Sequence, residues 1–159
     1  MRPDYDISLH ELVLSLSHAL DLVSPAMANH HKRVAYTALR VAERLGIRGK
    51  DKQDIVIAGA LHDIGALSSQ ERSAALASDS GMRHARFGYQ LLMKFPPFED
   101  AARIVRYHHV PWEGGRGHEV EGETVPTGSH ILHLADRVDA YLEGDDPILQ
   151  QGRRVLEQV

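Results

Sequence analysis

The stretch Ala58–Leu67, AGALHDIGAL, places a histidine beside an aspartate at the end of a run that is otherwise small and apolar. Such a run is typical of a helix packed in the interior. Burying a carboxylate without a partner is costly, so buried acids are usually paired or bound to a metal ion. The adjacent His62 and Asp63 therefore predict a buried polar site, whose other members must come from elsewhere in the chain.

The composition is that of an ordinary globular protein. The chain has 159 residues, of which 43% are hydrophobic and 25% charged, and its formal net charge is −4. We expect residues 1–159 to form a single domain. The negative charge excludes the basic field that binds nucleic-acid polymers, so metal ions or a few arginines would have to hold a phosphate-bearing ligand.

The expected location is the cytoplasm. The chain contains no cysteine, which excludes disulfides and thiolate metal ligands. The first residues, MRPDYDISLH, carry acids and no apolar core, so we expect no secretory signal. No stretch approaches the ~20 apolar residues of a membrane span, and membrane insertion is not expected.

Apolar residues recur at helical spacing through nearly the whole chain, which predicts an all-α bundle of about six to seven helices. Ser8 is a suitable N-cap, Gly46 a stop signal, and Ser68 with Glu71 a capping box. The expected helices cover residues 8–23, 25–45, 51–62, 81–94, 97–109 and 129–141, with another beginning at Asp146-Pro147. Residues 110–128, which contain five glycines and two prolines, should form an irregular loop.

The end of the chain, PILQQGRRVLEQV, stops while its apolar residues still recur at helical spacing. A natural chain can end in this way, and the pattern is equally expected of a piece of a longer protein.

Eleven histidines are the unusual feature of the composition. Several lie where a predicted helix begins or ends, separated by about one helix plus a connection, so one rim of a bundle could gather them. The candidate ligands are His30, His62, Asp63, His84, His108, His109 and Asp136. Nitrogen and oxygen ligands suit Fe, Mn, Zn, Co or Ni. Asp63 has candidates on both sides along the chain and is the carboxylate suited to bridge two ions.

Each candidate also has an ordinary structural interpretation. A buried histidine is more often a hydrogen-bonded core residue than a ligand, and paired histidines at a helix end can interact with the helix dipole. Asp136 could pair with Arg137 or Arg103. The joint pattern is what favours a metal site.

On these residues the sequence resembles the HD superfamily of metal-dependent phosphohydrolases, and more narrowly its HD-GYP subgroup. The order and spacing agree from about residue 27 to residue 143. The matching motifs are HHKRV at 30–34, LHDIG at 61–65, His84, YHHVPWEGG at 107–115 and HILHLADRVDAY at 130–141.

The resemblance implies a helical bundle that binds two divalent transition-metal ions. One ion would be held by His30, His62, Asp63 and Asp136, and the second by Asp63, His84, His108 and His109. Asp63 would be the catalytic bridge that holds the nucleophilic water between the ions. Relatives with a third ion have a glutamate one turn before the first histidine, where this sequence has Pro25–Met27, so two ions are expected.

The activity implied by the resemblance is hydrolysis of cyclic dinucleotides, chiefly cyclic di-GMP. Two motifs depart from the subgroup: Ala66 replaces a lysine thought to meet the substrate phosphate, and Arg116-Gly117 occupy the region of the GYP signature. A charged hydrogen bond of this kind contributes about 1.5–3 kcal/mol. Two alternatives therefore stay open: a hydrolase of another nucleotide or small phosphate ester, and a weakly active or non-catalytic signalling module that binds metal or nucleotide. Fused or interacting signalling domains are common in the family.

Five residues are candidates for substrate contact. Arg116, Arg83 or Arg86 could replace the missing charge, Trp112 could stack on a base, and His133 shares a helix face with Asp136. The ordinary alternatives are solvated arginines, a tryptophan that pins its loop to the core, and an outward-facing histidine. His31, rotated roughly 100° from His30, was not included. The remaining histidines, His10, His18, His118 and His130, are interpreted as surface residues.

Overall fold

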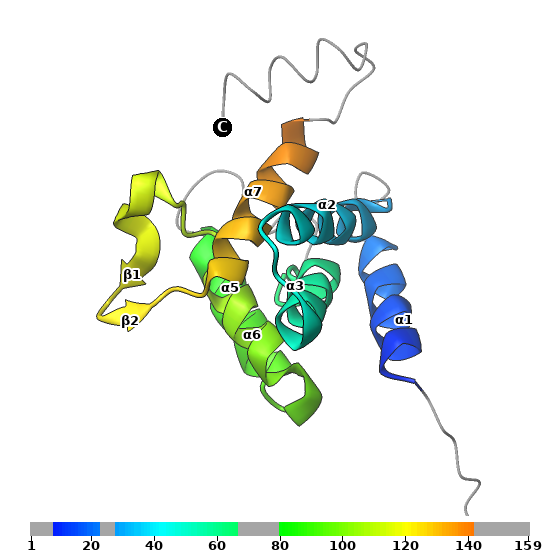
Figure 1. Cartoon of the computed structure of the whole chain (residues 1–159). Coiled ribbons are helices and arrows are strands. Elements are labelled where there is room, and N and C mark those ends of the chain that lie inside the picture. The colour runs from blue at the N-terminus through cyan, green and yellow to red at the C-terminus, as the bar shows by residue number, and fades with distance from the viewer. Residues whose placement is uncertain (1–7, 23–27, 67–79, 142–159) are drawn as a thin grey trace, which may run out of the picture.

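The computed structural model describes residues 8–22, 28–66 and 80–141, except for the side chains of residues 80 and 81. The helices are α1 (Leu9–Asp21), α2 (His30–Arg44), α3 (Gly49–Leu61), α5 (Ser80–Leu92), α6 (Glu99–Arg106) and α7 (Thr127–Tyr141) (Figure 1). Two 3₁₀ helices, η2 (Pro96–Phe98) and η3 (Glu113–His118), and the strands β1 (Glu119–Val120) and β2 (Glu123–Thr124) complete the described part. The prediction of an all-α fold is confirmed.

Within these ranges, none of the helices is long and apolar enough to cross a bilayer. The expected capping box at Ser68–Glu71, the turn at Pro25–Met27 and the helix from Asp146 lie outside the described residues.

The predicted helix-end signals at Ser8 and Gly46 are confirmed. The Ser8 hydroxyl accepts a hydrogen bond from the backbone N–H of Glu11, whose carboxylate accepts one from the backbone N–H of Ser8. Gly46 follows the C-cap of α2 with a φ of +75°, a conformation that glycine adopts without strain.

The predicted helix over residues 97–109 was too long. Helix α6 ends at Arg106, and the backbone N–H groups of Tyr107 and His108 bond to carbonyls three residues back. This tighter turn replaces the last helical turn and carries His108 and His109 together. The apolar spacing runs on through Val110, so it gave no sign of the change.

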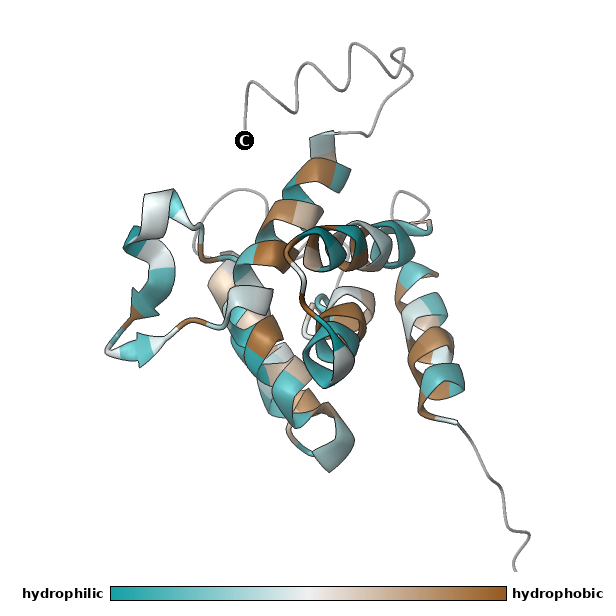
Figure 2. Ribbon diagram, in the orientation of Figure 1, coloured by the Kyte–Doolittle hydropathy of each residue, from teal (hydrophilic) through white to brown (hydrophobic). Residues whose placement is uncertain are grey.

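The segment over residues 110–128 is more ordered than expected. It contains η3 and an antiparallel hairpin in which Glu119 pairs with Thr124 and Val120 with Glu123. Both residues of its turn, Glu121 and Gly122, have positive φ, as a two-residue hairpin turn requires. The hairpin projects from the bundle and is mostly hydrophilic (Figures 1 and 2).

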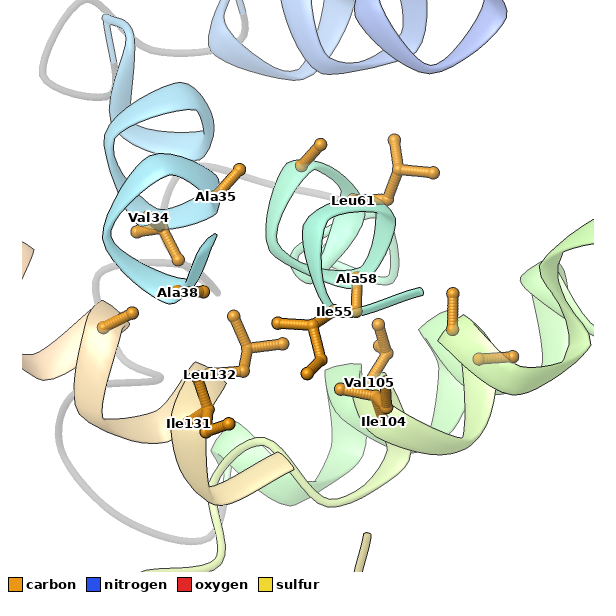
Figure 3. Packing of buried hydrophobic residues seen from close by; sticks show 14 of the residues in the cluster. Val34, Ala35, Ala38, Ile55, Ala58, Leu61, Ile104, Val105, Ile131 and Leu132 are labelled. Carbon is orange, nitrogen blue, oxygen red and sulfur yellow. The ribbon is translucent and has the colours of Figure 1, made fainter. Parts of the chain in front are cut away.

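Helix α3 is the centre of the bundle, since it packs against α1, α2, α6 and α7. Buried side chains from α2, α3, α6 and α7 meet around it (Figure 3). Those labelled in the figure are Val34, Ala35, Ala38, Ile55, Ala58, Leu61, Ile104, Val105, Ile131 and Leu132. Because α3 ends at Leu61, its packing places the His62-Asp63 pair at one end of the core.

Two glycines allow backbones to approach closely beside this pair. A Cβ on Gly59 would lie 2.8 Å from Cα of Ala35 in α2. A Cβ on Gly65 would lie 2.1 Å from the carbonyl oxygen of His84 and 2.4 Å from the backbone N of Gly88, both in α5. The turn that carries Asp63 therefore rests directly on the backbone of α5.

We predict that Gly65→Ala destabilises the protein. The added methyl group collides with backbone atoms, so a backbone must shift, at a cost of about 1–3 kcal/mol or more. The free energy of unfolding in urea measures the effect. Gln90→Ala, an exposed substitution on α5, is the control and should stay within about 0.5 kcal/mol of wild type. Wild-type stability of Gly65→Ala would contradict the packing described.

Candidate metal centre

The seven candidate ligands come together from the ends of α2, α3, α5 and α6 and from the middle of α7. Six of the seven form two groups of three, and within each group the ligand atoms lie within 4.8 Å of one another. The first group is His30, His62 and Asp136, and the second is His84, His108 and His109. All are buried except His109, which is half-buried.

Asp63 lies between the two groups. Its Oδ1 is 3.2 Å from Nε2 of His84, in the second group. Its Oδ2 is 3.6 Å from Nε2 of His62 and 3.9 Å from Nε2 of His30, in the first. Each carboxylate oxygen thus faces a different group, as a carboxylate that bridges two cations must.

Hydrogen bonds donated by Nδ1 fix which nitrogen faces the centre in His62 and His108. Nδ1 of His62 donates to the carbonyl oxygen of Gly59 at 3.0 Å, and Nδ1 of His108 donates to that of Val105 at 2.7 Å. A carbonyl oxygen only accepts, so Nδ1 carries the hydrogen and the neutral ring presents a lone pair at Nε2.

The Nε2 atoms face one another at short range. Nε2 of His30 and His62 are 3.3 Å apart, and Nε2 of His84 is 3.3 Å from that of His108 and 3.0 Å from that of His109. Nδ1 of both His30 and His62 donates to an acceptor, so in the neutral rings two lone pairs face each other and repel. A shared cation removes the repulsion, and neutral imidazole with carboxylate is a common ligand set for divalent transition metals. The residues therefore fit a metal ion.

A proton provides part of this positive charge when no metal is bound. Burial lowers the pKa of His62, but the carboxylates of Asp63 and Asp136 outweigh it and raise the pKa to about 9. Burial and the neighbouring His84 lower the pKa of His109 to about 4. Burial and the neighbouring histidines also lower the pKa of His108 well below its usual value. The charged imidazole of His62 thus lies beside two carboxylates, while the rings of His108 and His109 are neutral.

Asp139 and Arg33 are functional candidates that the sequence analysis missed. Oδ2 of Asp139 accepts a hydrogen bond from Nδ1 of His30 at 2.7 Å. Both carboxylate oxygens accept from the Arg33 guanidinium, at 2.6 and 2.8 Å. These bonds hold the ring of His30 with Nε2 toward the centre. Asp139 lies three residues after Asp136, on the same helix face, and that spacing was the available signal.

His31 and Asp21 were also missed. His31 is fully buried, and its Nδ1 donates to Oδ1 of Asp21 at 2.6 Å. The rotation of roughly 100° from His30 turns the ring toward α1 rather than toward solvent. Burial and the nearby charge of His62 lower the pKa of His31 to about 4, so the ring is neutral at physiological pH.

The arginines considered for substrate contact lie on the surface. Arg83, Arg86 and Arg116 are exposed. Arg86 lies 3.5 Å from Glu121, and Arg116 lies 3.6 Å from Glu113. Ala66, at the position of the expected lysine, is buried.

The aromatic ring of Trp112 is 54% exposed and touches the ring of His130 edge-on, with centroids 5.0 Å apart. The tryptophan therefore does not pin its loop by burial. The prediction that His130 is a surface residue was wrong, because its ring is half-buried and bonds to the carbonyl of Val110. The other histidines interpreted as surface residues, His10, His18 and His118, are exposed.

His133 is half-buried, and its Nδ1 donates to the carbonyl oxygen of His108 at 3.0 Å. It thus supports the turn that carries the paired histidines. The arginines considered as partners of Asp136 have other contacts: Arg103 pairs with Glu99, and Arg137 donates to the hydroxyl of Tyr141. Asp136 instead lies 3.4 Å from His30 and 3.5 Å from His62.

The chain is similar to known proteins over most of its length. A family model described as HD domain matches residues 27–141. The chain is 31% identical over 146 residues to the 3'3'-cGAMP-specific phosphodiesterase 3 of Vibrio cholerae, covering 85% of this chain and 31% of that protein. It is 28% identical over 144 residues to the cyclic di-GMP phosphodiesterase response regulator RpfG of Xanthomonas campestris, covering 83% of this chain and 38% of that protein. The chain thus spans about a third of the length of these curated relatives.

Among solved structures, the fold is similar to the HD domain of the L. monocytogenes phosphodiesterase PgpH in complex with cyclic-di-AMP. The TM-score is 0.62 at 16% sequence identity, and the match covers 91% of this chain and 80% of the other. This likeness concerns the fold.

We predict that the metal-free protein is most stable near pH 6.5. In the unfolded chain the pKa of His31 and of His109 is about 6.5, whereas in the folded protein it is about 4. Between pH 6.5 and pH 4 the unfolded state therefore binds more protons, and lowering the pH favours unfolding. The raised pKa of His62 contributes stability that is lost as the pH rises from about 6.5 through about 9. Thermal unfolding in chelator across pH 4.5–9.5 measures the profile. Stability that keeps rising below pH 6 would contradict it.

We further predict that Asp139→Asn weakens metal binding by roughly tenfold to a hundredfold, the usual effect of losing a carboxylate that orients a ligand histidine. Calorimetric titration with Mn²⁺ measures the affinity. Asp51→Asn, at an exposed position on α3, is the matched control and should bind as wild type does. Equal affinities in the two variants would show that Asp139 does not support the site.

Proposed function

This chain belongs to the HD domain family, and from that premise we propose that it is a metal-dependent phosphodiesterase acting on cyclic dinucleotides. The observation that carries the proposal is the position of Asp63 between two groups of converging imidazoles. The named activities of the V. cholerae and X. campestris relatives, both cyclic dinucleotide phosphodiesterases, support the substrate class. The chain would then be the catalytic part of a longer protein.

We assign two divalent transition-metal ions to the site. His30, His62 and Asp136 would hold one, His84, His108 and His109 the other, and Asp63 both. Iron, manganese, zinc, cobalt and nickel all accept such a nitrogen and oxygen ligand set. When bound, such ions lower the pKa of a coordinated water and neutralise phosphoryl oxygens.

The chain's own residues position this chemistry. Asp63 sets the spacing of the two groups, since one rigid carboxylate faces both. Carbonyl oxygens behind His62 and His108 hold the rings in one tautomer, so the ligands need not reorganise when an ion binds. Of the seven residues assigned to the ions, only the two carboxylates carry a negative charge, because the five imidazoles would bind as neutral ligands. Two divalent ions would therefore leave a surplus of positive charge at the site. That surplus is complementary to a phosphodiester.

We assign base contact to Trp112, because its exposed ring lies three residues after His109 and can stack on a nucleobase. Of the exposed arginines, Arg83, Arg86 and Arg116 are the candidates for phosphate contact. The buried Ala66 provides no charge at the position of the expected lysine. This replacement is the observation that favours the second candidate function, a signalling module that binds metal and nucleotide with little turnover.

The test is hydrolysis of cyclic di-GMP by protein purified without chelator, with its metal content measured. We predict that Asp63→Ala lowers kcat at least roughly a hundredfold, since the variant loses the carboxylate that both ions share. Asp51→Asn is the control for a lost surface carboxylate and should retain activity. A rate that is the same in the wild type and in Asp63→Ala would overturn the proposal.

The remaining outcomes distinguish the alternatives. Cleavage of a generic phosphodiester but of no cyclic dinucleotide would assign the protein to another phosphate ester. Binding of metal and cyclic di-GMP without turnover would support the signalling module.

A further inference from the structure

We propose that His31 is an additional metal ligand, whose Nε2 binds a cation shared with Oδ2 of Asp63 and whose ring is held by Asp21. The inference rests on the proposed metal-dependent function and adds two residues to its site. Neither His31 nor Asp21 is among the residues assigned to the two ions above.

The position of His31 is comparable to that of His30. Its ring centroid lies 5.1 Å from that of His30 and 5.2 Å from that of His62. Its Nε2 is 3.9 Å from Oδ2 of Asp63, the same distance that separates Nε2 of His30 from this oxygen. Two neighbouring residues of α2 thus present ring nitrogens to one carboxylate oxygen.

Asp21 determines what His31 presents. Asp21 is the last residue of α1, and its Oδ1 accepts a hydrogen bond from Nδ1 of His31 at 2.6 Å. The neutral ring of His31 therefore has its lone pair at Nε2. This nitrogen is buried and has no hydrogen-bond partner within the described ranges. A carboxylate behind a histidine whose other nitrogen is free is the usual support of a metal-bound imidazole.

The distance between His31 and Asp63 is compatible with a shared cation and too long for a direct hydrogen bond. At 3.9 Å, Nε2 and Oδ2 are too far apart for a hydrogen bond, which spans about 2.7–3.2 Å. A water bonded to both atoms would hold them about 4.5 Å apart. A transition metal lies about 2.0–2.2 Å from each ligand, so two ligands of one ion can be 3.9 Å apart.

A purely structural role is the competing explanation: the Asp21–His31 hydrogen bond would then serve only to join α1 to α2. His31→Asn separates the two roles. Its side-chain amide can still donate to Asp21 from near the position of Nδ1, but it has no atom that reaches toward Asp63. The matched control is His18→Asn, an exposed histidine on α1, and His30→Asn is the comparison for loss of a family ligand.

The experiment titrates the chelator-stripped protein with Co²⁺, whose visible absorption reports the ligands around it, and compares melting temperatures with and without Co²⁺. For His31→Asn we expect Co²⁺ affinity to fall roughly tenfold to a hundredfold, the visible spectrum to change, and the melting temperature in chelator to match that of wild type. His18→Asn should equal wild type throughout. Asp21→Asn should weaken Co²⁺ binding in the same direction, and it carries the test if His31→Asn does not fold.

Wild-type affinity and spectrum in His31→Asn, or in Asp21→Asn where only that variant folds, would overturn the ligand role. So would a lower melting temperature in chelator with an unchanged rise on adding Co²⁺, because that result is structural. If the wild-type protein itself bound no Co²⁺, the proposed function would fail together with this inference. Wild-type binding with an unaffected variant refutes the inference alone.

Discussion

The burial of Asp63 is the constraint on which the rest of the site depends. A buried carboxylate is tolerated only where positive charge and hydrogen-bond donors compensate for its lost hydration. Here the compensation comes from imidazoles on both sides, at 3.2 Å from His84 and 3.6 Å from His62. A neutral His62, whose Nε2 presents a lone pair, cannot supply it, so on this side the compensation comes from a cation: a proton on His62 in the metal-free protein, or a metal ion.

Unpaired carbonyl groups at the ends of two helices fix the orientation of two of these rings. The last four carbonyl groups of a helix have no partner within it. Gly59 and Val105 lie in the last turns of α3 and α6, and their carbonyls accept from the rings of His62 and His108. One hydrogen bond thus satisfies a carbonyl and directs Nε2 into the centre. His62 and His108, which follow α3 and α6, are therefore each oriented by the helix that precedes them.

The sequence predicted those features that depend on local rules. Helical spacing, the Ser8 cap and the Gly46 stop depend on neighbouring residues, and they agree with the structure. The end of α6 was misplaced because the tight turn at Tyr107 and His108 leaves the apolar pattern unchanged. The hairpin was missed because its Glu121-Gly122 turn lacks the usual Asn-Gly or Asp-Gly signal.

The partners of ligand residues were harder to predict than the ligand candidates. Histidines at helix ends can be read from spacing, but Asp21 reaches His31 only because α1 crosses α2 at a suitable angle. Such crossings depend on side-chain packing, which periodicity does not describe. The same limit applies to Asp139, whose contact with His30 joins α7 to α2.

The buried imidazole cluster and the exposed residues around it are stabilised by different interactions. At the imidazole cluster, the buried rings of His30, His62 and His108 are each fixed by a carboxylate or a carbonyl, so replacing one of them leaves a buried polar group unpaired. Among the exposed residues, Arg86–Glu121 and Arg116–Glu113 are surface ion pairs, which contribute about 0–1 kcal/mol each. Replacing these exposed residues costs the fold little. The buried imidazole cluster and the exposed residues around it can therefore change independently of each other.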